Sequence, residues 1–213
     1  MKKQPHAWVG VFDAPEKPAE GDETVDWRFG VKVVETAIPG VLIIEPEIFG
    51  DSRGFFMETY QVDRYAVAGI SRTFVQDNLS RSSRGVLRGL HLQNPGSQGK
   101  LVTVLSGSAL DVAVDMRRGS PSFGQHVALE LTDQNRRQLW IPRGFAHGFA
   151  VMSDVADFFY KSDAPYSRSA EIVVRWNDPA LGIEWGIAEP ILSERDAAAP
   201  VLADVDNLPV YEP

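Results

Sequence analysis

The stretch Leu101–Asp115 (LVTVLSGSALDVAVD) contains two short β-forming runs, Leu101–Leu105 and Ala109–Asp115, with turn residues between them. Similar runs recur from Val41 onward, separated by Gly, Pro, Ser and Asn at short intervals. This spacing is typical of an all-β sandwich or closed barrel. The remaining runs are Val41–Glu45, Phe55–Tyr60, Phe74–Asn78, Val86–Leu92, Val127–Leu131, Gln138–Ile141, Phe145–Met152, Phe158–Lys161 and Ile172–Trp176.

Outside these runs, the sequence predicts two short helices and an N-terminal appendage. Val62–Ala68 is followed by a glycine, and Ser193–Ala199 begins with a suitable N-cap residue. Residues 1–35 have no sustained period, so we expect an appendage to a single domain that spans residues 36–213. The appendage is either a disordered tail or a segment that docks through its aromatic residues, Trp8, Phe12, Trp27 and Phe29.

The composition is that of a globular domain in water. Of the 213 residues, 44% are hydrophobic and 23% are charged, far from disordered or membrane compositions. The formal net charge of -8 offers no general attraction to nucleic acid or anionic lipid, so we expect neither as a partner. The absence of cysteine excludes disulfides and a Cys nucleophile. Since no apolar run approaches the roughly 20 residues of a membrane helix, we expect a cytoplasmic protein.

Each histidine can be weighed individually, because the chain has only four. His6 lies in the appendage and His126 in a predicted strand, where a structural role is the simpler interpretation. His91 ends a run in which apolar and polar residues alternate. Strict strand alternation would place Arg88 and His91 on opposite faces, so only a bulge at Gly89 would bring both into one cavity.

His147 interrupts an otherwise apolar run, and on residue chemistry alone a hydrogen-bonded core histidine is the better interpretation of both it and His91. A metal site is the other interpretation, because jelly-roll barrels often bind Fe or Zn through clustered histidines and carboxylates. The usual pattern has two histidines separated by one residue, but Gln93 occupies the second position. We therefore expect no metal.

Five cations gather in a chain that is acidic overall: Arg53, Arg81, Arg84, Arg88 and Lys100. We interpret Arg81 and Arg84 as solvated loop charges. Arg88 and Lys100 lie in or beside predicted strands and should be half-buried, which is costly for a cation without an anionic partner. A bound phosphate or an enolate oxygen would supply that partner.

Seven motifs follow one another in order between residue 41 and about residue 200. They are Phe49–Tyr60 (FGDSRGFFMETY), Phe74–Asn78 (FVQDN), Arg84–His91 (RGVLRGLH), Gln98–Val102 (QGKLV), Asp111–Asp115 (DVAVD), Trp140–Phe149 (WIPRGFAHGF) and Arg175–Pro179 (RWNDP). Together and in this order they resemble the dTDP-4-dehydrorhamnose 3,5-epimerase family. The resemblance implies an all-β, cupin-like jelly-roll barrel with a few short helices, and an enzyme that needs no cofactor.

The resemblance also implies a substrate, a dTDP-4-keto-6-deoxy-sugar whose carbons C3 and C5 are inverted on the way to dTDP-L-rhamnose. Its C4 ketone acidifies the protons on both neighbouring carbons, and a neutral imidazole is a suitable base at cell pH. His91 matches the family's base, and Lys100 matches the cation that stabilises the enolate. Tyr160 matches the acid on the opposite face, and Asp196 matches the carboxylate that orients the base.

By motif position, the resemblance further implies a substrate-binding set and a homodimer. Asp111 matches a supporting carboxylate beside His147. An N-terminal strand with Arg53 and Glu58 would cross to the neighbouring subunit's site, and pairing would also cover barrel edge strands. The residues expected to contact the substrate are Arg53, Glu58, Gln76, Asp77, Asn78, Arg88, His147, Tyr166, Glu171 and Arg195.

Other functions are compatible with parts of this pattern. A 3-epimerase or 5-epimerase of a related dTDP-4-keto-deoxysugar would use the same base and acid on one carbon. A non-catalytic, sugar-nucleotide-binding cupin would need neither, so the presence of both His91 and Tyr160 argues against it. A metal-dependent cupin dioxygenase would need the ligand that Gln93 replaces.

Overall fold

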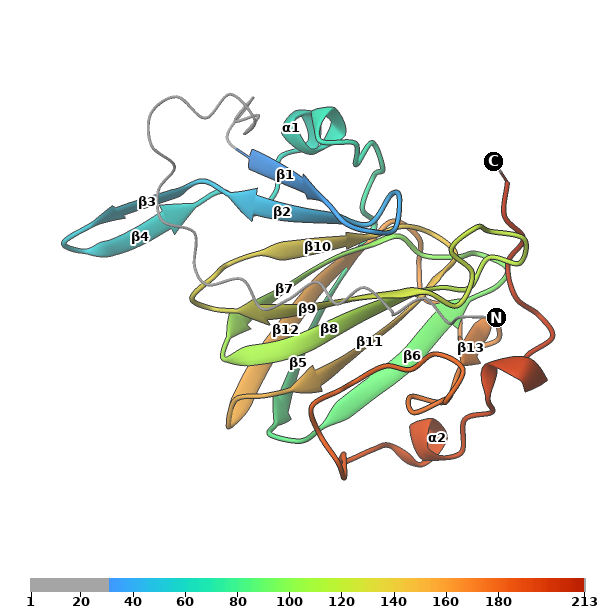
Figure 1. Cartoon of the computed structure of the whole chain (residues 1–213). Helices are drawn as coiled ribbons and strands as arrows, with labels where there is room; N and C mark the ends of the chain where they lie inside the picture. Colours follow the sequence, from blue (N-terminus) through green and yellow to red (C-terminus); the bar gives the residue numbers. More distant parts are fainter. Residues whose placement is uncertain (1–30, 213) are drawn as a thin grey trace.

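The computed structural model describes residues 31–212, which form two antiparallel β-sheets packed face to face (Figure 1). The six-stranded sheet has the order β1-β2-β10-β7-β12-β5, and the five-stranded sheet has the order β13-β6-β11-β8-β9. A separate hairpin contains β3 and β4. The strands are β1 Val31–Glu35, β2 Leu42–Pro46, β3 Ile48–Asp51, β4 Gly54–Met57, β5 Gln76–Ser83, β6 Leu87–Gln93, β7 Lys100–Ser106, β8 Ser108–Asp115, β9 His126–Thr132, β10 Gln138–Ile141, β11 Phe145–Val151, β12 Val155–Ser162 and β13 Glu171–Val173.

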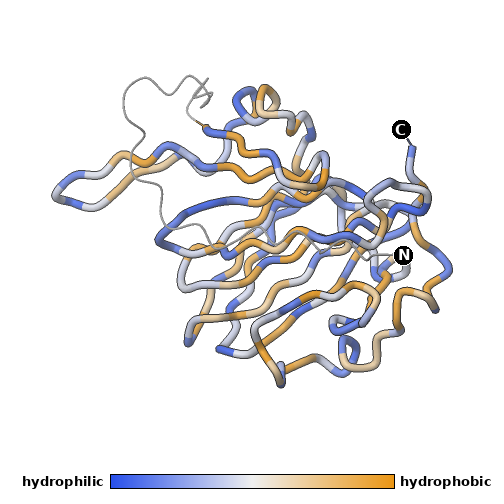
Figure 2. Tube along the Cα trace, in the orientation of Figure 1, coloured by the Kyte–Doolittle hydropathy of each residue, from blue (hydrophilic) through white to orange (hydrophobic). Residues whose placement is uncertain are grey.

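The main hydrophobic core lies between the two sheets. Val102 and Phe158 of the six-stranded sheet meet Ala113 and Phe149 of the five-stranded sheet there. The rings of Phe149 and Phe158 stack with 3.9 Å between their centroids. Figure 2 shows hydrophobic and hydrophilic residues alternating along several strands, as expected where one strand face is buried. Burying each large apolar side chain contributes roughly 1.5–3 kcal/mol, so this core supplies much of the fold's stability.

A second core covers the outer face of the five-stranded sheet. Leu90 of this sheet packs there with Leu181 and Trp185, which belong to the C-terminal part of the chain. The same part contains α2 (Glu194–Ala197) and a short 3-10 helix (Leu202–Asp204). Because both faces of the sheet are covered, β11 is buried along its whole length. Polar side chains on such a strand need partners inside the protein.

The hairpin of β3 and β4 projects from the end of the six-stranded sheet (Figure 1). Its side chains Phe49, Phe55 and Phe56 are 55%, 57% and 69% exposed. Exposed groups of large apolar residues commonly mark an interaction surface. The chain then enters α1 (Val62–Val67), whose Tyr65 is fully buried and donates a hydrogen bond to Gln138 Oε1.

The predicted all-β architecture is confirmed, since every predicted run overlaps an observed strand. Both short helices are present, and the Ser193 side chain caps α2 by accepting a hydrogen bond from Asp196 N. Two strands were not predicted, β1 and β3. The first of them, Val31–Glu35, lies in the segment assigned to the appendage and pairs with β2.

The predicted location of one charged residue is wrong. Arg81 lies on β5 rather than in a loop, because β5 pairs with β12 as far as Ser83. Its guanidinium is nevertheless exposed and pairs with Asp157 on the neighbouring strand. Residues 1–30 lie outside the described residues, so docking of their aromatic side chains stays a prediction. Among residues 31–212, no helix is long and apolar enough to cross a membrane.

Candidate active site

Four of the predicted site residues come together inside the barrel, two from each sheet. His91 on β6 and His147 on β11 are register partners in the five-stranded sheet. Lys100 begins β7 and Tyr160 lies on the adjacent β12. The ring centroids of His147 and Tyr160 are 6.3 Å apart, and Lys100 Nζ lies 5.7 Å from the Tyr160 ring centroid. An imidazole pair on one sheet therefore faces a cation and a hydroxyl on the other.

A bulge at Gly89, the position considered in the sequence analysis, interrupts the pairing of β6 with β11. His147 pairs with His91 and Phe149 pairs with Arg88, so β6 has one residue more than β11 over this interval. Gly89 has φ +124°, and a Cβ atom there would lie 2.5 Å from Gly148 Cα. Only glycine fits this position, because both the backbone conformation and the neighbouring strand exclude a side chain.

His91 forms a dyad with Asp196 of α2. The His91 Nε2 and Asp196 Oδ1 atoms are 2.6 Å apart, and Asp196 Oδ2 accepts a hydrogen bond of 2.8 Å from Ser193 Oγ. A carboxylate only accepts hydrogen bonds, so Nε2 carries the proton of the neutral imidazole and Nδ1 keeps a lone pair. Burial alone would raise the pKa of the Asp196 carboxyl, but His91, Ser193 and the nearby Arg195 charge together hold it below its ordinary value.

A second dyad joins His147 to Asp111 of β8. The His147 Nε2 and Asp111 Oδ1 atoms are 2.7 Å apart, and both side chains are buried. Burial lowers the pKa of His147, although the Asp111 charge opposes this shift. Asp111 Oδ2 has no hydrogen-bond partner among the described residues. His147 is therefore a neutral, fixed imidazole at physiological pH.

The two site groups on the six-stranded sheet have shifted pKa values. Burial lowers the pKa of the Lys100 ammonium to about 8, while the charges of Asp111 and Glu171 oppose the shift. Burial raises the pKa of the Tyr160 hydroxyl, Glu171 adds to the rise, and the Arg88 charge opposes it. Near pH 7 the site thus holds a mostly protonated lysine and a protonated tyrosine beside the neutral imidazole of His147. This combination suits proton abstraction and return at a carbon next to a ketone.

Several predicted substrate-binding residues surround this group. Gln76 accepts a hydrogen bond from the Tyr166 backbone and donates one to Asn78 on the inner face of β5. The Tyr166 hydroxyl donates to Glu171, which also pairs with Arg195 beside the dyad carboxylate. These contacts link β5, β13 and α2 around one side of the site.

Arg88 differs from the expectation of a half-buried cation. It is exposed, and its guanidinium donates hydrogen bonds of 3.2 and 3.0 Å to Ser82 Oγ. Lys100, by contrast, is only 9% exposed. Ser82 was not predicted, although continuing the period-2 pattern from Gln76 and Asn78 along the inner face of β5 would have found it.

Three residues predicted to contact the substrate lie away from the His91 site of the same subunit. Arg53 sits on the projecting hairpin, pairs with Asp51, and has an 88% exposed side chain. Glu58 follows that hairpin and pairs with Arg64 of α1. Asp77 lies on the outer face of β5 and pairs with Lys161. Strand alternation explains Asp77, because its neighbours in sequence point inward.

Metal ligands do not gather at this site. Within residues 31–212, no group of three or more His, Asp or Glu side chains could hold a metal ion. Gln93, at the position where a second histidine would stand, is buried, donates a hydrogen bond to Gly96 O and accepts one from Ser167 N. Gln93 thus links the backbone after β6 to the backbone before β13.

Comparison with known proteins gives one consistent family. The sequence model of the family described as dTDP-4-dehydrorhamnose 3,5-epimerase matches residues 35–204. The dTDP-4-dehydrorhamnose 3,5-epimerase of Salmonella typhimurium is 54% identical over 80% of this chain and 94% of that protein. The Pseudomonas aeruginosa enzyme of the same name is 50% identical over 84% and 100%. A Legionella pneumophila epimerase, solved in complex with dTDP-4-keto-L-rhamnose, is 50% identical with a TM-score of 0.84, covering 86% of this chain and all of that one.

Proposed function

The chain belongs to the dTDP-4-dehydrorhamnose 3,5-epimerase family, and we propose that it inverts C3 and C5 of dTDP-4-dehydro-6-deoxy-D-glucose on the way to dTDP-L-rhamnose. One observation carries the proposal. His91, which pairs with Asp196, lies on the five-stranded sheet, whereas Lys100 and Tyr160 lie on the six-stranded sheet. A sugar ring held between them would meet a base and an acid on opposite faces.

The reaction begins with proton removal by His91. The lone pair of Nδ1 takes a proton from C3 or C5, and the electrons of that C–H bond move into the C4 carbonyl to give an enolate. Asp196 stabilises the imidazolium through the Nε2–H hydrogen bond. Lys100 stabilises the negative charge on O4, because a cation fixed there interacts more strongly with the enolate than with the ketone.

Inversion requires that the proton return to the other face. Tyr160 donates its hydroxyl proton to the enolate carbon, the C4 carbonyl re-forms, and the tyrosinate and imidazolium then exchange protons with solvent. The raised pKa of Tyr160 keeps the hydroxyl protonated between turnovers. The same cycle at the second carbon completes the double inversion.

The remaining residues hold the nucleotide sugar. Gln76, Asn78 and Glu171 offer hydrogen bonds to sugar and nucleotide groups, and Asn78 Nδ2 is buried without a partner inside residues 31–212. Arg88 and Arg195 supply positive charge for the diphosphate. His147, fixed by Asp111, presents its second ring nitrogen to the sugar.

The active unit is a homodimer. The exposed aromatic side chains of the β3–β4 hairpin and the outward position of Arg53 support this arrangement, because both suit contact with a second subunit. Arg53 and Glu58 would then contact the substrate in the partner's barrel. Light scattering should give a dimer, and a fully active monomer at assay dilution would contradict the proposal.

A mixing experiment tests the shared site directly. Subunits with Arg53→Ala and subunits with His91→Ala should each be almost inactive. Hybrid dimers contain one site with an intact His91 and an intact neighbouring Arg53, so the mixture should regain activity. Mixtures no more active than their parents would show that Arg53 acts only within its own chain.

The function itself is tested with dTDP-4-keto-6-deoxyglucose in deuterated water. Deuterium at both C3 and C5, with L-rhamno product stereochemistry, is the expected result by NMR. Deuterium and inversion at one carbon would indicate a 3-epimerase or 5-epimerase instead. Binding without exchange would indicate a non-catalytic sugar-nucleotide protein. We place this cofactor-free reaction in the cytoplasm, where the cysteine-free chain would fold without disulfides.

A further inference from the structure

The position of Asp196 depends on a very short helix. α2 spans only Glu194–Ala197, a single turn, and such a helix has little stability of its own. Yet Asp196 is 3% exposed and sits 2.6 Å from His91 Nε2. The backbone on both sides of α2 must therefore be held by other parts of the chain.

On the N-terminal side, the strand that carries His91 holds the chain. Ile191 N donates to Gly85 O at 2.8 Å, and Leu87 N donates to Ile191 O at 3.1 Å. Ser193 then caps α2 and contacts Asp196 directly. This side of α2 is consequently tied to β6.

On the C-terminal side, the motif Arg175–Pro179 holds the chain. Arg175 N donates to Pro200 O at 2.8 Å, and its Nε donates to Ala199 O at 3.2 Å. Asp178 accepts hydrogen bonds from Leu202 N at 2.6 Å and from Ala180 N at 2.8 Å. Asp178 is 4% exposed, and both of its oxygens are used. None of these groups takes part in the proposed chemistry.

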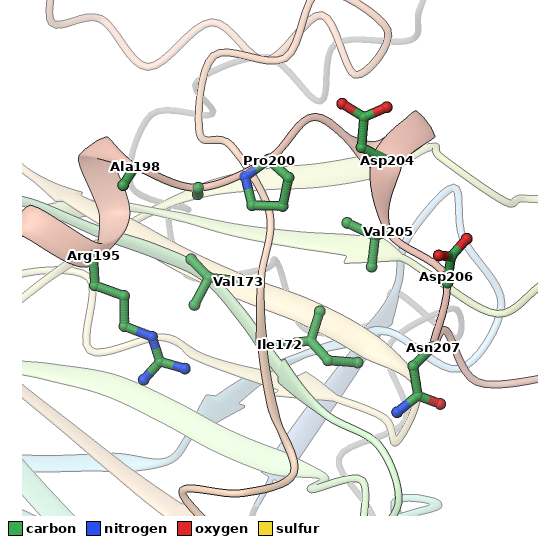
Figure 3. Close-up of a pocket in the computed structure, with 10 residues that line it drawn as sticks. Ile172, Val173, Arg195, Ala198, Pro200, Asp204, Val205, Asp206 and Asn207 are labelled. Carbon is green, nitrogen blue, oxygen red and sulfur yellow. The ribbon is translucent and has the colours of Figure 1, made fainter.

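An open surface pocket of about 530 Å³ lies between β13 and the chain after α2. Figure 3 shows part of its lining, with Ile172 and Val173 of β13 and with Pro200 and Val205 of the chain after α2. Ile172 and Val205 also pack in the core on the outer face of the five-stranded sheet. The hydrogen bonds of Arg175 and Asp178 therefore act together with this packing to fix the segment.

We propose that Asp178 is a positioning residue for the His91–Asp196 dyad, acting through its hydrogen bond to Leu202 N. With that bond, the segment after α2 stays close to Arg175 and keeps Asp196 against His91. Without it, α2 moves and the dyad hydrogen bond weakens. The kinetic consequence rests on the proposed function, but the dyad geometry can be measured without substrate.

A pair of substitutions at Leu202 isolates the single hydrogen bond. Leu202→Pro removes the N–H group, and the backbone tolerates it, because residue 202 begins the 3-10 helix and Val201 has φ -68° and ψ 156°. Leu202→Ala also removes the side chain but keeps the N–H group. Asp178→Asn adds a third variant in which the carboxylate is neutralised. Tyr65→Phe, which removes a buried hydrogen bond on the other side of the fold, controls for a general loss of stability.

The first measurement is proton NMR of the free enzyme. An imidazole N–H bonded to a carboxylate resonates far downfield, and His91→Gln and His147→Gln assign the two dyad signals. We expect the His91 signal to broaden or shift in Leu202→Pro and Asp178→Asn but to persist in Leu202→Ala and Tyr65→Phe. An unchanged His91 signal in the Leu202→Pro protein would overturn the proposal.

The second measurement is steady-state kinetics. We expect kcat of Leu202→Pro to fall about tenfold below that of Leu202→Ala, with KM within about twofold, as a weakened charge-assisted hydrogen bond requires. Equal kcat values for the two variants would also overturn the proposal. If the wild-type protein does not turn over the substrate, the proposed function fails and the NMR comparison still decides this inference.

Discussion

Lys100 gives the sharpest prediction. Its burial lowers the pKa of the ammonium, and this one shift should determine both how kcat depends on pH and how much the buried charge destabilises the fold. With a pKa of about 8, its ammonium is roughly 90% protonated at pH 7 and roughly 10% at pH 9. Since only the ammonium stabilises the enolate, kcat should fall as pH rises through about 8, by up to tenfold for each further pH unit.

Replacing Lys100 should remove both the stabilisation of the enolate and the cost of burying a charged group. Lys100→Met keeps an unbranched chain of similar length without the charge. Loss of one preorganised group at a developing oxyanion typically lowers kcat about 10²–10³-fold, which corresponds to about 3–4 kcal/mol. The residual activity of this variant should lack the decline above pH 8.

The stability effect has the opposite sign. The unfolded chain, with an ordinary lysine pKa of 10.5, binds this proton more tightly than the folded protein, whose pKa is about 8. The folded state is therefore destabilised below pH 8 by about 3 kcal/mol, and this cost disappears as pH rises from about 8 to 10.5. Lys100→Met should accordingly melt no lower than the wild type at pH 7. Product analysis by NMR between pH 6 and 10, with thermal unfolding, provides the test. A Lys100→Met variant with wild-type activity, or one less stable than the wild type at pH 7, would refute the reasoning.

Three further predictions concern the dyad, the bulge and metals. Asp196→Asn should lower kcat about 10- to 100-fold with little change in KM, because the imidazolium loses a charge-assisted hydrogen bond; an unchanged kcat would contradict this role. Gly89→Ala should lower the free energy of unfolding in urea by about 2–4 kcal/mol, because its Cβ would meet the backbone of Gly148. Gly96→Ala, with φ +79° and no atom within 4 Å of the added Cβ, should lower it by about 1 kcal/mol. Equal losses would show that the contact with Gly148 does not matter. Activity should survive a chelator, and loss that is recovered with Fe or Zn would indicate a metal site.

The strands of the barrel could be predicted because their signals are local. Turn residues and period-2 alternation located every strand from Val41 onward except β3, and the alternation around Arg88 and His91 singled out Gly89 as the place where a bulge could occur. Strand β1 was missed because its apolar residues follow an acidic, proline-rich segment. The same strand alternation could have shown that Asp77 points away from the site, unlike Gln76 and Asn78.

The catalytic pairing could not be predicted from local pattern. His91 and Asp196 are 105 residues apart, and only the family resemblance connected them. Residue chemistry marked Lys100 as a buried cation, but Tyr160 looks like an ordinary strand aromatic until β7 and β12 are paired. Arg88 on β6 donates to Ser82 on β5 of the other sheet, a contact that no single-strand pattern encodes.

The central claim is that His91 and Tyr160 act on opposite faces of the sugar, and deuterium incorporation separates the two roles. His91→Ala should abolish both epimerisation and exchange at C3 and C5, whereas Tyr160→Phe should impair inversion more than exchange. The difference arises because the imidazolium can still return a solvent deuteron to the face from which it took the proton. Tyr160→Phe epimerising at the wild-type rate, or His91→Ala still exchanging freely, would contradict the account.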